Sequence, residues 1–340
     1  MDAIVTDTMW YSPNRLLSHN ALLNIVLSNR GAGKSYSAKE KIINNYLKKG
    51  KQSVYVRRKV KEIDKIKKKF WNDMKAKYNH LELTTDGEVG YINGEPVVYF
   101  VALSTSSDLK SDAFPNVDLI VFDEYIITKT THSRYLKNEM VLLFDLMETV
   151  FRIRDNGTVL LIGNSVSFVN PLFSFFDIEP DKSKRFQKFK DGLICLELFK
   201  SAKYIEQKKN TRFGKLVEGT TYGKYAIENE TLEDTNEFIM NRGSFKYSFI
   251  CVFKYESFKM GVWYCKEEDF YFCDEIIDNG SPHKFCMLLD EIEEGYQYFK
   301  TYRNISYRIK NVKEASSIGN LFFCSQEIKK TMQNNVLPYL

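Results

Sequence analysis

The chain of 340 residues is 44% hydrophobic and 27% charged, with a formal net charge of +5, which excludes a disordered chain and leaves room for two domains. No apolar run approaches the roughly 20 residues that a membrane span needs, and the N-terminus lacks the features of a secretory signal. Six cysteines without a C-x-x-C pair favour free thiols in a reducing cytoplasm, and four scattered histidines make a zinc site improbable.

From residue 22 to about 195 the pattern alternates between apolar strands and amphipathic helices. Several strands are continuous apolar runs, which favours a buried parallel sheet and therefore an α/β domain over residues 1–200. A hairpin over 87–99 is expected to turn at Asn93-Gly94. Strands are expected at 22–27, 53–56, 97–103, 119–122 and 159–163, and helices at 35–48, 61–78 and 139–152.

A glycine-bearing turn, Ser28-Asn-Arg-Gly-Ala-Gly-Lys-Ser35, joins the first of these strands to the first helix. Its glycines allow backbone N–H groups to surround an anion, its lysine neutralises charge, and its hydroxyl can hold Mg²⁺. We therefore expect Lys34 at the β- and γ-phosphates of a nucleotide and Ser35 on the metal ion. Ser28 stands where the usual pattern has glycine. The residues predicted to bind the nucleotide are Arg30, Gly31, Ala32, Gly33, Lys34, Ser35 and Tyr36.

Two aromatic residues and an amide precede this loop, in Trp10-Tyr11-Ser-Pro-Asn14. An adenine contact through Trp10 and Asn14 is one interpretation, and ordinary packing is the other. The cation-rich segments 57–69 and 182–190 also allow two interpretations. They are either solvated helix faces or surfaces that follow a phosphate backbone.

The run Asp118-Leu-Ile-Val-Phe-Asp123-Glu124 places two carboxylates at the end of an apolar strand. In a parallel sheet that end faces the phosphate loop, so Asp123 is predicted to hold Mg²⁺ and Glu124 to polarise the attacking water. Adjacent Asp and Glu indicate the additional-strand catalytic-glutamate (ASCE) branch of P-loop NTPases, with a RecA-like sheet. Asn164 ends the next strand and is predicted to sense the γ-phosphate or orient water.

Two arginines, Arg152 and Arg154, follow the helix expected over 139–152. They either bind the carbonyl groups at the end of that helix, or one of them acts as an arginine finger on the nucleotide of a neighbouring subunit. After Pro180 the character of the sequence changes. Residues 201–234 are polar and predict a small linker domain, whereas the aromatic, strand-like segment 235–340 predicts a separate α+β domain.

Several motifs together resemble the DNA-packaging ATPase of phi-29-type small podoviruses, over nearly the whole chain. The resemblance is strong from about residue 20 to 230 and weak beyond. The motifs are Arg30-Gly-x-Gly-Lys-Ser35-Tyr36, Tyr55-Val-Arg57-Arg58, Phe114/Pro115-Asn-Val117, Val121-Phe-Asp123-Glu124, Thr149-Val-Phe-Arg152, Val169-Asn170-Pro171 and Thr211-Arg-Phe-Gly214…Gly219-Thr-x-Tyr-Gly223.

The resemblance implies an ATPase that forms a homomeric, pentameric ring and drives double-stranded DNA into a prohead. The ring would meet the portal (connector) of the prohead through a structural RNA, and the protein would occupy the host cytoplasm and, transiently, the prohead. Arg152 matches the family's trans-acting finger, and Lys110 matches a second cation acting on the neighbour's site. Residues predicted to contact DNA are Arg57, Arg58, Lys59 and Lys61.

Large terminases add a nuclease of RNase H type, which needs clustered carboxylates for two metal ions. The acidic residues of the C-terminal part form no recognisable pattern of that kind, so a vestigial nuclease-like domain with a binding role, directed to the RNA, is expected. Two alternatives remain open: a small-molecule P-loop kinase with an accessory domain, and a binding protein whose loop holds nucleotide without hydrolysis. The acidic residues concerned are Asp269, Asp274, Glu275, Asp290 and Glu291.

Overall fold

The computed structural model describes two units, Met1–Glu233 and Asp234–Leu340, and each is described here by itself. Residues 201–233 group with the first unit, because Ile205, Val217 and Ile227 pack against one of its apolar cores. No helix in the described part is long and apolar enough to cross a membrane. The described residues are 5–126, 135–136, 139–165, 170–176, 178–220, 223, 227, 238–278, 280–281, 283–301, 307–317 and 320–340.

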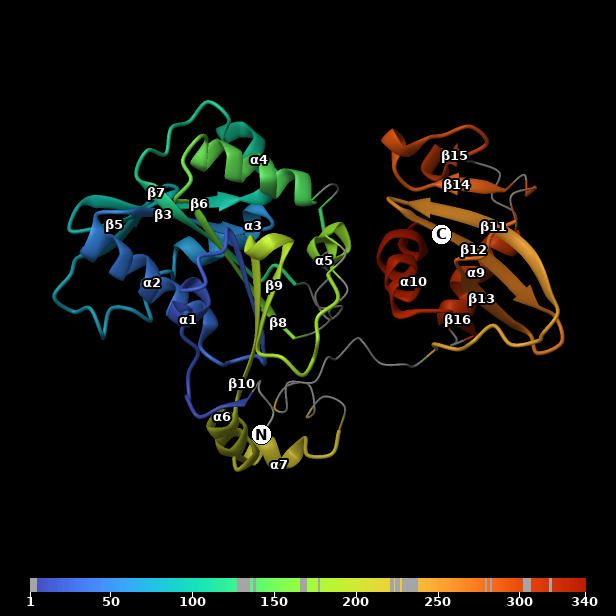
Figure 1. Ribbon diagram of the computed structural model, residues 1–340, viewed down its shortest axis with the longest axis horizontal. Coiled ribbons are helices and arrows are strands. Elements are labelled where there is room, and N and C mark those ends of the chain that lie inside the picture. Colours follow the sequence, from blue (N-terminus) through green and yellow to red (C-terminus); the bar gives the residue numbers. More distant parts are fainter. Residues whose placement is uncertain are drawn as a thin grey trace. The chain divides into compact units, whose positions relative to one another are not determined.

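The first unit is built on a ten-stranded sheet in the order β1-β10-β2-β8-β7-β3-β6-β5-β4, with β9 beside β10 (Figure 1). From β1 to β6 along this order every neighbouring pair is parallel, whereas β4, β5 and β9 pair antiparallel. The strands are β1 (Val5–Thr6), β2 (Leu23–Ser28), β3 (Gln52–Arg57), β4 (Leu83–Asp86), β5 (Val89–Ile92), β6 (Glu95–Ala102), β7 (Val117–Asp123), β8 (Thr158–Asn164), β9 (Phe186–Phe189) and β10 (Ile194–Ser201).

Each face of this sheet carries its own apolar core, so its central strands are buried on both sides. Along β2, Ile25 and Leu27 belong to one core and Val26 to the other, as the period of two residues in a strand requires. The first core includes side chains of α4 and α5, and the second includes side chains of α1, α2 and α3. The helices are α1 (Asn14–Leu17), α2 (Lys34–Lys49), α3 (Val60–Lys67), η1 (Leu103–Leu109), α4 (Glu139–Phe151), α5 (Pro171–Phe176), η2 (Lys190–Gly192), α6 (Ala202–Lys209) and α7 (Arg212–Leu216).

A mixed α/β fold with a parallel sheet is therefore confirmed, and the hairpin lies where it was expected. Ile92 pairs with Glu95, which leaves Asn93 and Gly94 as the two turn residues, with φ values of 51° and 79°. Positive φ at both central residues is what an Asn-Gly hairpin turn requires. The helix expected over 61–78 is shorter than predicted. It ends as α3 at Lys67, and residues 68–80 continue as a series of turns.

The second unit has a six-stranded sheet in the order β15-β14-β11-β12-β13-β16. Its three longest strands, β11 (Tyr247–Tyr255), β12 (Phe258–Cys265) and β13 (Phe270–Asp274), are antiparallel, and the others add to them in parallel. Apolar side chains of α9 and α10 complete its core. The remaining elements are β14 (Lys284–Cys286), η3 (Leu289–Glu291), β15 (Gln297–Tyr298), η4 (Phe299–Thr301), α9 (Tyr307–Ser317), β16 (Leu321–Phe323), α10 (Gln326–Thr331), η5 (Met332–Val336) and η6 (Leu337–Tyr339).

Candidate functional site

Four adjacent parallel strands of the first unit, in the order β2-β8-β7-β3, end at the same edge of the sheet. Their last residues are Ser28, Asn164, Asp123 and Arg57. Ser28 and Asn164 are paired residues in the ladder between β2 and β8. Ligand sites of open α/β sheets lie beyond the carboxyl ends of the strands. This edge is therefore the first place to look for chemistry.

The loop after β2 has the backbone of an anion cradle. Gly31 and Gly33 both have a φ of 86°, a conformation that favours glycine, and α2 begins directly after them at Lys34. A Cβ on Gly31 would lie 2.5 Å from the hydroxyl of Tyr204, which donates a hydrogen bond to the carbonyl oxygen of Arg30 at 2.9 Å. Trp10 packs edge-on to Tyr204 and lies beside Gly33. The loop is thus held in place by Tyr204 of α6.

Lys34 is buried with its ammonium group among uncharged oxygens. Nζ donates to Ser28 Oγ at 2.6 Å, to the carbonyl oxygens of Ser28 and Asn29 at 3.2 and 3.0 Å, and to Asn164 Oδ1 at 3.1 Å. Burial is the main cause that lowers the pKa of Lys34 to about 7, and the nearby Asp123 opposes it. An arriving phosphate would supply the counter-charge that this site lacks.

Asp123 is the hub of the site, 2% exposed and bonded through both carboxylate oxygens. Ser35 Oγ and the backbone N–H of Glu124 donate to Oδ1 at 3.1 and 3.0 Å. The Tyr55 hydroxyl and Arg57 Nη2 donate to Oδ2 at 2.6 and 2.9 Å. Burial, followed by the charge of Asp123, raises the pKa of Tyr55 well above its usual value. The carboxylate is therefore held in one orientation next to the Ser35 hydroxyl.

Glu124 has a backbone φ of 58° and a side chain that is 65% exposed. Its carboxylate forms an ion pair with Arg57 Nη1 at 2.5 Å. Burial lowers the pKa of Arg57, and the carboxylates of Asp123 and Glu124 more than offset this, so that the net shift is upward. Arg57 thus ties both carboxylates of the site together.

The burial of Arg57 and Arg58 contradicts the prediction that they contact DNA. They are only 6% and 2% exposed, and both pair with groups of the protein itself. Arg58 Nε and Nη2 donate to Glu139 at 2.7 and 2.9 Å, and Arg58 Nη2 also donates to the carbonyl oxygen of Tyr125 at 2.5 Å. Neither guanidinium is available to DNA. Lys61 is exposed, and Lys59 is half-buried at the start of α3.

A cleft of about 300 Å³ unites these groups. It is lined by Arg30, Gly31, Ala32, Gly33, Lys34, Ser35, Tyr36, Asp123, Glu124, Ile162, Gly163 and Asn164. The predicted nucleotide residues therefore lie together with the predicted acids Asp123 and Glu124 and with the strand-end amide of Asn164. Among the described residues no group of three or more His, Cys, Asp or Glu side chains could hold a metal ion.

Arg152 lies away from this cleft, near the amino ends of the parallel strands. It follows α4, has a φ of 50°, is exposed, and donates to the carbonyl oxygen of Asp112 at 3.1 Å. The neighbouring Arg154 donates to the carbonyl oxygen of Val117, the first residue of β7, at 2.8 Å. Asp123 is the last of the seven residues of β7, which places it about 20 Å from Val117 at about 3.3 Å per residue. Arg152 is too far to reach its own cleft.

Two further predicted groups are also separate from the cleft. The guanidinium of Arg154 is occupied by main-chain hydrogen bonds, since it also donates to the carbonyl oxygens of Phe114 and Pro115 at 2.7 Å each. Lys110 is exposed and pairs with Asp145 of α4 at 3.1 Å. Of the motif residues in the resemblance, Val169 and Tyr222 lie outside the described residues, as does the predicted 234/235 boundary.

Sequence reasoning missed Tyr55, Tyr204 and the pairing role of Arg57. The strand-end rule would have found Arg57, since β3 is parallel to β7 and ends where the cation-rich segment begins. No local pattern marks Tyr204, whose partner Arg30 is 174 residues away in the chain. In the second unit, Asp274 pairs with Arg242 at 2.7 Å and Asp269 accepts from the Tyr264 hydroxyl at 2.8 Å.

A family model for the Podovirus DNA encapsidation protein (Gp16) matches residues 5–337. The DNA packaging protein of Bacillus phage phi29 is 35% identical over 322 residues, covering 95% of both chains, and that of Bacillus phage B103 is 34% identical, covering 92% of this chain and 95% of the relative. A solved chain of the bacteriophage phi29 viral genome packaging motor assembly superposes with a TM-score of 0.68 at 34% identity, covering 96% of this chain and 98% of that one. The N-terminal domain of the DNA packaging ATPase from phi29 superposes with a TM-score of 0.54 at 39% identity, covering 58% of this chain and 100% of that domain.

Proposed function

This chain belongs to the podovirus DNA encapsidation protein (Gp16) family and is a component of a viral DNA-packaging motor, and we propose that it hydrolyses ATP to translocate double-stranded DNA into a prohead. The observation that carries the proposal is the convergence of Lys34, Ser35, Asp123 and Glu124 on one cleft. A solved relative at 39% identity is itself described as a DNA packaging ATPase. The first unit is, in this proposal, a P-loop NTPase domain of the ASCE branch with a RecA-like sheet.

The residues of the cleft fit ATP and Mg²⁺. The glycine turn offers N–H groups and the start of α2 to the phosphates, and Lys34 offers the positive charge. Ser35 Oγ and Asp123 Oδ1, 3.1 Å apart, are the oxygen donors that would hold Mg²⁺. Two protein ligands suffice, because Mg²⁺ keeps several waters and takes further oxygens from the phosphates. When bound, the ion would neutralise charge on the transferred phosphoryl group.

Glu124 is the group that would orient and activate the attacking water. Its exposed carboxylate lines the cleft one residue beyond the Asp123 hub, and Arg57 holds it. General-base assistance of this kind contributes roughly 10²- to 10⁴-fold in rate. We propose that Asn164, which accepts a hydrogen bond from Lys34, meets the γ-phosphate.

Completion of the site requires a second copy of the chain. Arg152 is exposed and contacts Asp112, ahead of the amino end of β7, and the length of β7 separates that end from Asp123 by about 20 Å, so an arginine finger at this position must act on a neighbouring subunit. Lys110 lies near it, in the segment that supplies the Asp112 carbonyl oxygen to Arg152. This supports a homomeric ring, which we take to be pentameric by family resemblance.

The remaining assignments follow the family resemblance. We propose that Lys59 and Lys61 contact DNA, that the segment after residue 200 links the ATPase unit to the C-terminal unit, and that the latter contacts the structural RNA and the portal. Antiparallel β11–β12–β13, with β14 and β15 added in parallel beside β11, supports a vestigial RNase H-type fold. The paired Asp274 supports a binding role over nuclease activity. The protein would act in the host cytoplasm, docked on the prohead while packaging proceeds.

Hydrolysis measured with and without long duplex DNA tests the proposal. Wild-type protein is expected to release phosphate from ATP, and faster with DNA. Glu124→Gln is expected to bind ATP with near-normal affinity but to turn over at least about a hundredfold more slowly. Transfer of the γ-phosphate to a small acceptor with no response to DNA would instead indicate a kinase. Undetectable wild-type hydrolysis in the presence of DNA would overturn the proposal.

A further inference from the structure

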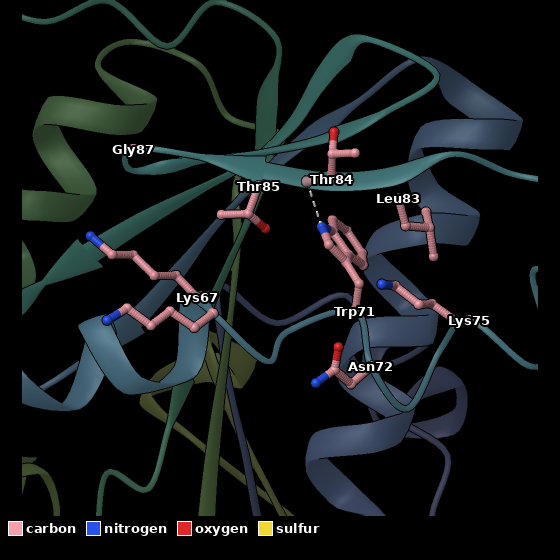
Figure 2. A pocket seen from close by; sticks show the side chains of 9 residues that line it. Lys67, Trp71, Asn72, Lys75, Leu83, Thr84, Thr85 and Gly87 are labelled. Atoms are coloured by element: carbon pink, nitrogen blue, oxygen red, sulfur yellow. Dashed lines mark hydrogen bonds between the residues drawn. The ribbon is translucent and has the colours of Figure 1, made fainter.

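A second cavity, of about 540 Å³, lies on the first unit away from the nucleotide cleft. One wall comes from the end of α3 at Lys67 and from the turns that follow it, with Lys68, Trp71 and Lys75, and the other comes from β4 at the edge of the sheet (Figure 2). None of its lining residues lines the nucleotide cleft. It is therefore an independent feature at the far end of the cation-rich segment.

Of the three lysines that line this cavity, only Lys67 is paired with acids among the described residues. Lys67 is neutralised internally, by Asp64 at 2.8 Å and by Glu88. Lys68 and Lys75 are exposed and have no acidic partner within 4 Å among the described residues. Other exposed lysines of the cation-rich segment also lack an acidic partner within 4 Å among the described residues. The exposed lysines of this region without an acidic partner among the described residues are Lys61, Lys65, Lys68, Lys69 and Lys75.

The spacing of these lysines aligns them with the cavity. Lys61, Lys65 and Lys68 are four and three residues apart, so they share one face of α3 and its C-cap. At about 1.5 Å per residue this row extends about 10 Å along the helix. The row leads from the predicted DNA contact at Lys61 into the cavity at Lys68. A continuous positive row of this kind matches a phosphate backbone better than a single anion does.

The floor of the cavity is rigid and offers polar groups. Trp71 is 3% exposed, and its Nε1 donates to the carbonyl oxygen of Thr84 at 2.7 Å, which fixes the turns against the sheet edge (Figure 2). Thr85 also lines the cavity, but its Oγ1 is buried and has no hydrogen-bond partner among the described residues. Asn72 adds an exposed amide. Side chains of this type contact phosphate oxygens in protein–DNA complexes.

We propose that the cavity between the turns after α3 and the edge strand β4 binds the phosphodiester backbone of double-stranded DNA, through Lys68 and Lys75. This cavity would add one further phosphate-binding site to the DNA contact proposed at Lys61. The inference rests on the proposed function, since it presumes that the chain holds duplex DNA. Its chemistry is sequence-independent, as a motor that moves along any sequence needs.

The test measures the affinity of the full chain for a short DNA duplex at several salt concentrations. Binding is detected by fluorescence anisotropy, with a non-hydrolysable ATP analogue present. The double variant Lys68→Gln/Lys75→Gln is compared with Lys48→Gln/Lys49→Gln. The control pair lies at the end of α2, where both lysines are also exposed and have no acidic partner within 4 Å in the part of the chain that the structure describes. Both variants lose the same charge, and neither alters a buried residue. Thermal unfolding and DNA-free ATP hydrolysis verify the fold.

The cavity variant is expected to lower the slope of log K against log[salt] by about 2, and to weaken binding on the order of tenfold at 0.1 M salt. The control is expected to change the slope by much less. Equal effects of the two variants would overturn the inference, as would a loss of affinity for an RNA duplex with DNA binding intact. Failure of the wild-type chain to bind DNA at all would instead refute the proposed function, and the inference with it.

Discussion

At the residue scale, the ammonium group of Lys34 accounts for much of what the nucleotide cleft can do. Its hydrogen-bond acceptors are two carbonyl oxygens, a hydroxyl and an amide, all uncharged. A cation in that setting is stabilised by geometry but not by a direct counter-charge, which is why burial lowers its pKa to about 7. A bound triphosphate would reverse that balance, because it brings negative charge to Nζ.

The lowered pKa predicts that nucleotide binding takes up a proton at alkaline pH. At pH 8, above the pKa of about 7, Lys34 is mostly neutral without nucleotide, and phosphate raises its pKa so that it becomes charged. At pH 6 it is already charged in both forms. Calorimetric titration with an ATP analogue, in two buffers of different ionisation enthalpy, should show uptake approaching one proton at pH 8 and much less at pH 6. Equal uptake at the two pH values would contradict this.

At the scale of elements, parallel strand ends explain which parts of the site were predictable. Lys34 and Ser35 follow from the glycine-bearing turn after an apolar strand, Asp123 and Asn164 follow from apolar strands that end in polar residues, and the cleft contains all four. Arg57 and Arg58 belong to the cation-dense segment 57–69, and their assignment to DNA contact is wrong because both are buried. Linear density does not reveal that β3 lies beside β7, or that Arg58 meets Glu139 of α4. Such contacts exist only in the folded chain.

The pairing of β3 with β7 predicts separate effects on chemistry and on DNA binding. Arg57→Gln removes the partner of two carboxylates, and breaking a buried ion pair typically costs about 3–5 kcal/mol of stability. Hydrolysis should fall steeply, and Arg57→Lys, which keeps the charge, should recover part of it. Duplex-DNA affinity and its salt dependence should stay as in the wild type for any folded variant. A salt slope reduced by about 1 with intact hydrolysis would restore the surface assignment.

At the scale of the whole molecule, the two ends of β7 separate the groups that the proposed hydrolysis requires. Asp123 and Glu124 lie at the carboxyl end, whereas Arg152 is held near the amino end by the short segment it shares with Arg154. The residue pattern alone left Arg152 and Arg154 as equivalent candidates, and the family resemblance singled out Arg152. The structure distinguishes them, since Arg154 binds main-chain oxygens while Arg152 remains exposed. In the proposed function, one chain therefore carries two halves of a site that would meet only between copies.

Mixing two inactive variants tests this central claim most directly. Arg152→Ala keeps an intact cleft but offers no finger, and should lose about a thousandfold or more in hydrolysis with ATP binding near normal. Glu124→Gln keeps the finger but has no functional base. Combined in the presence of long duplex DNA, the two should recover part of the wild-type turnover, because a Glu124→Gln neighbour supplies Arg152 to an intact cleft. Normal hydrolysis by Arg152→Ala alone, or a mixture no more active than its separate components, would contradict the account.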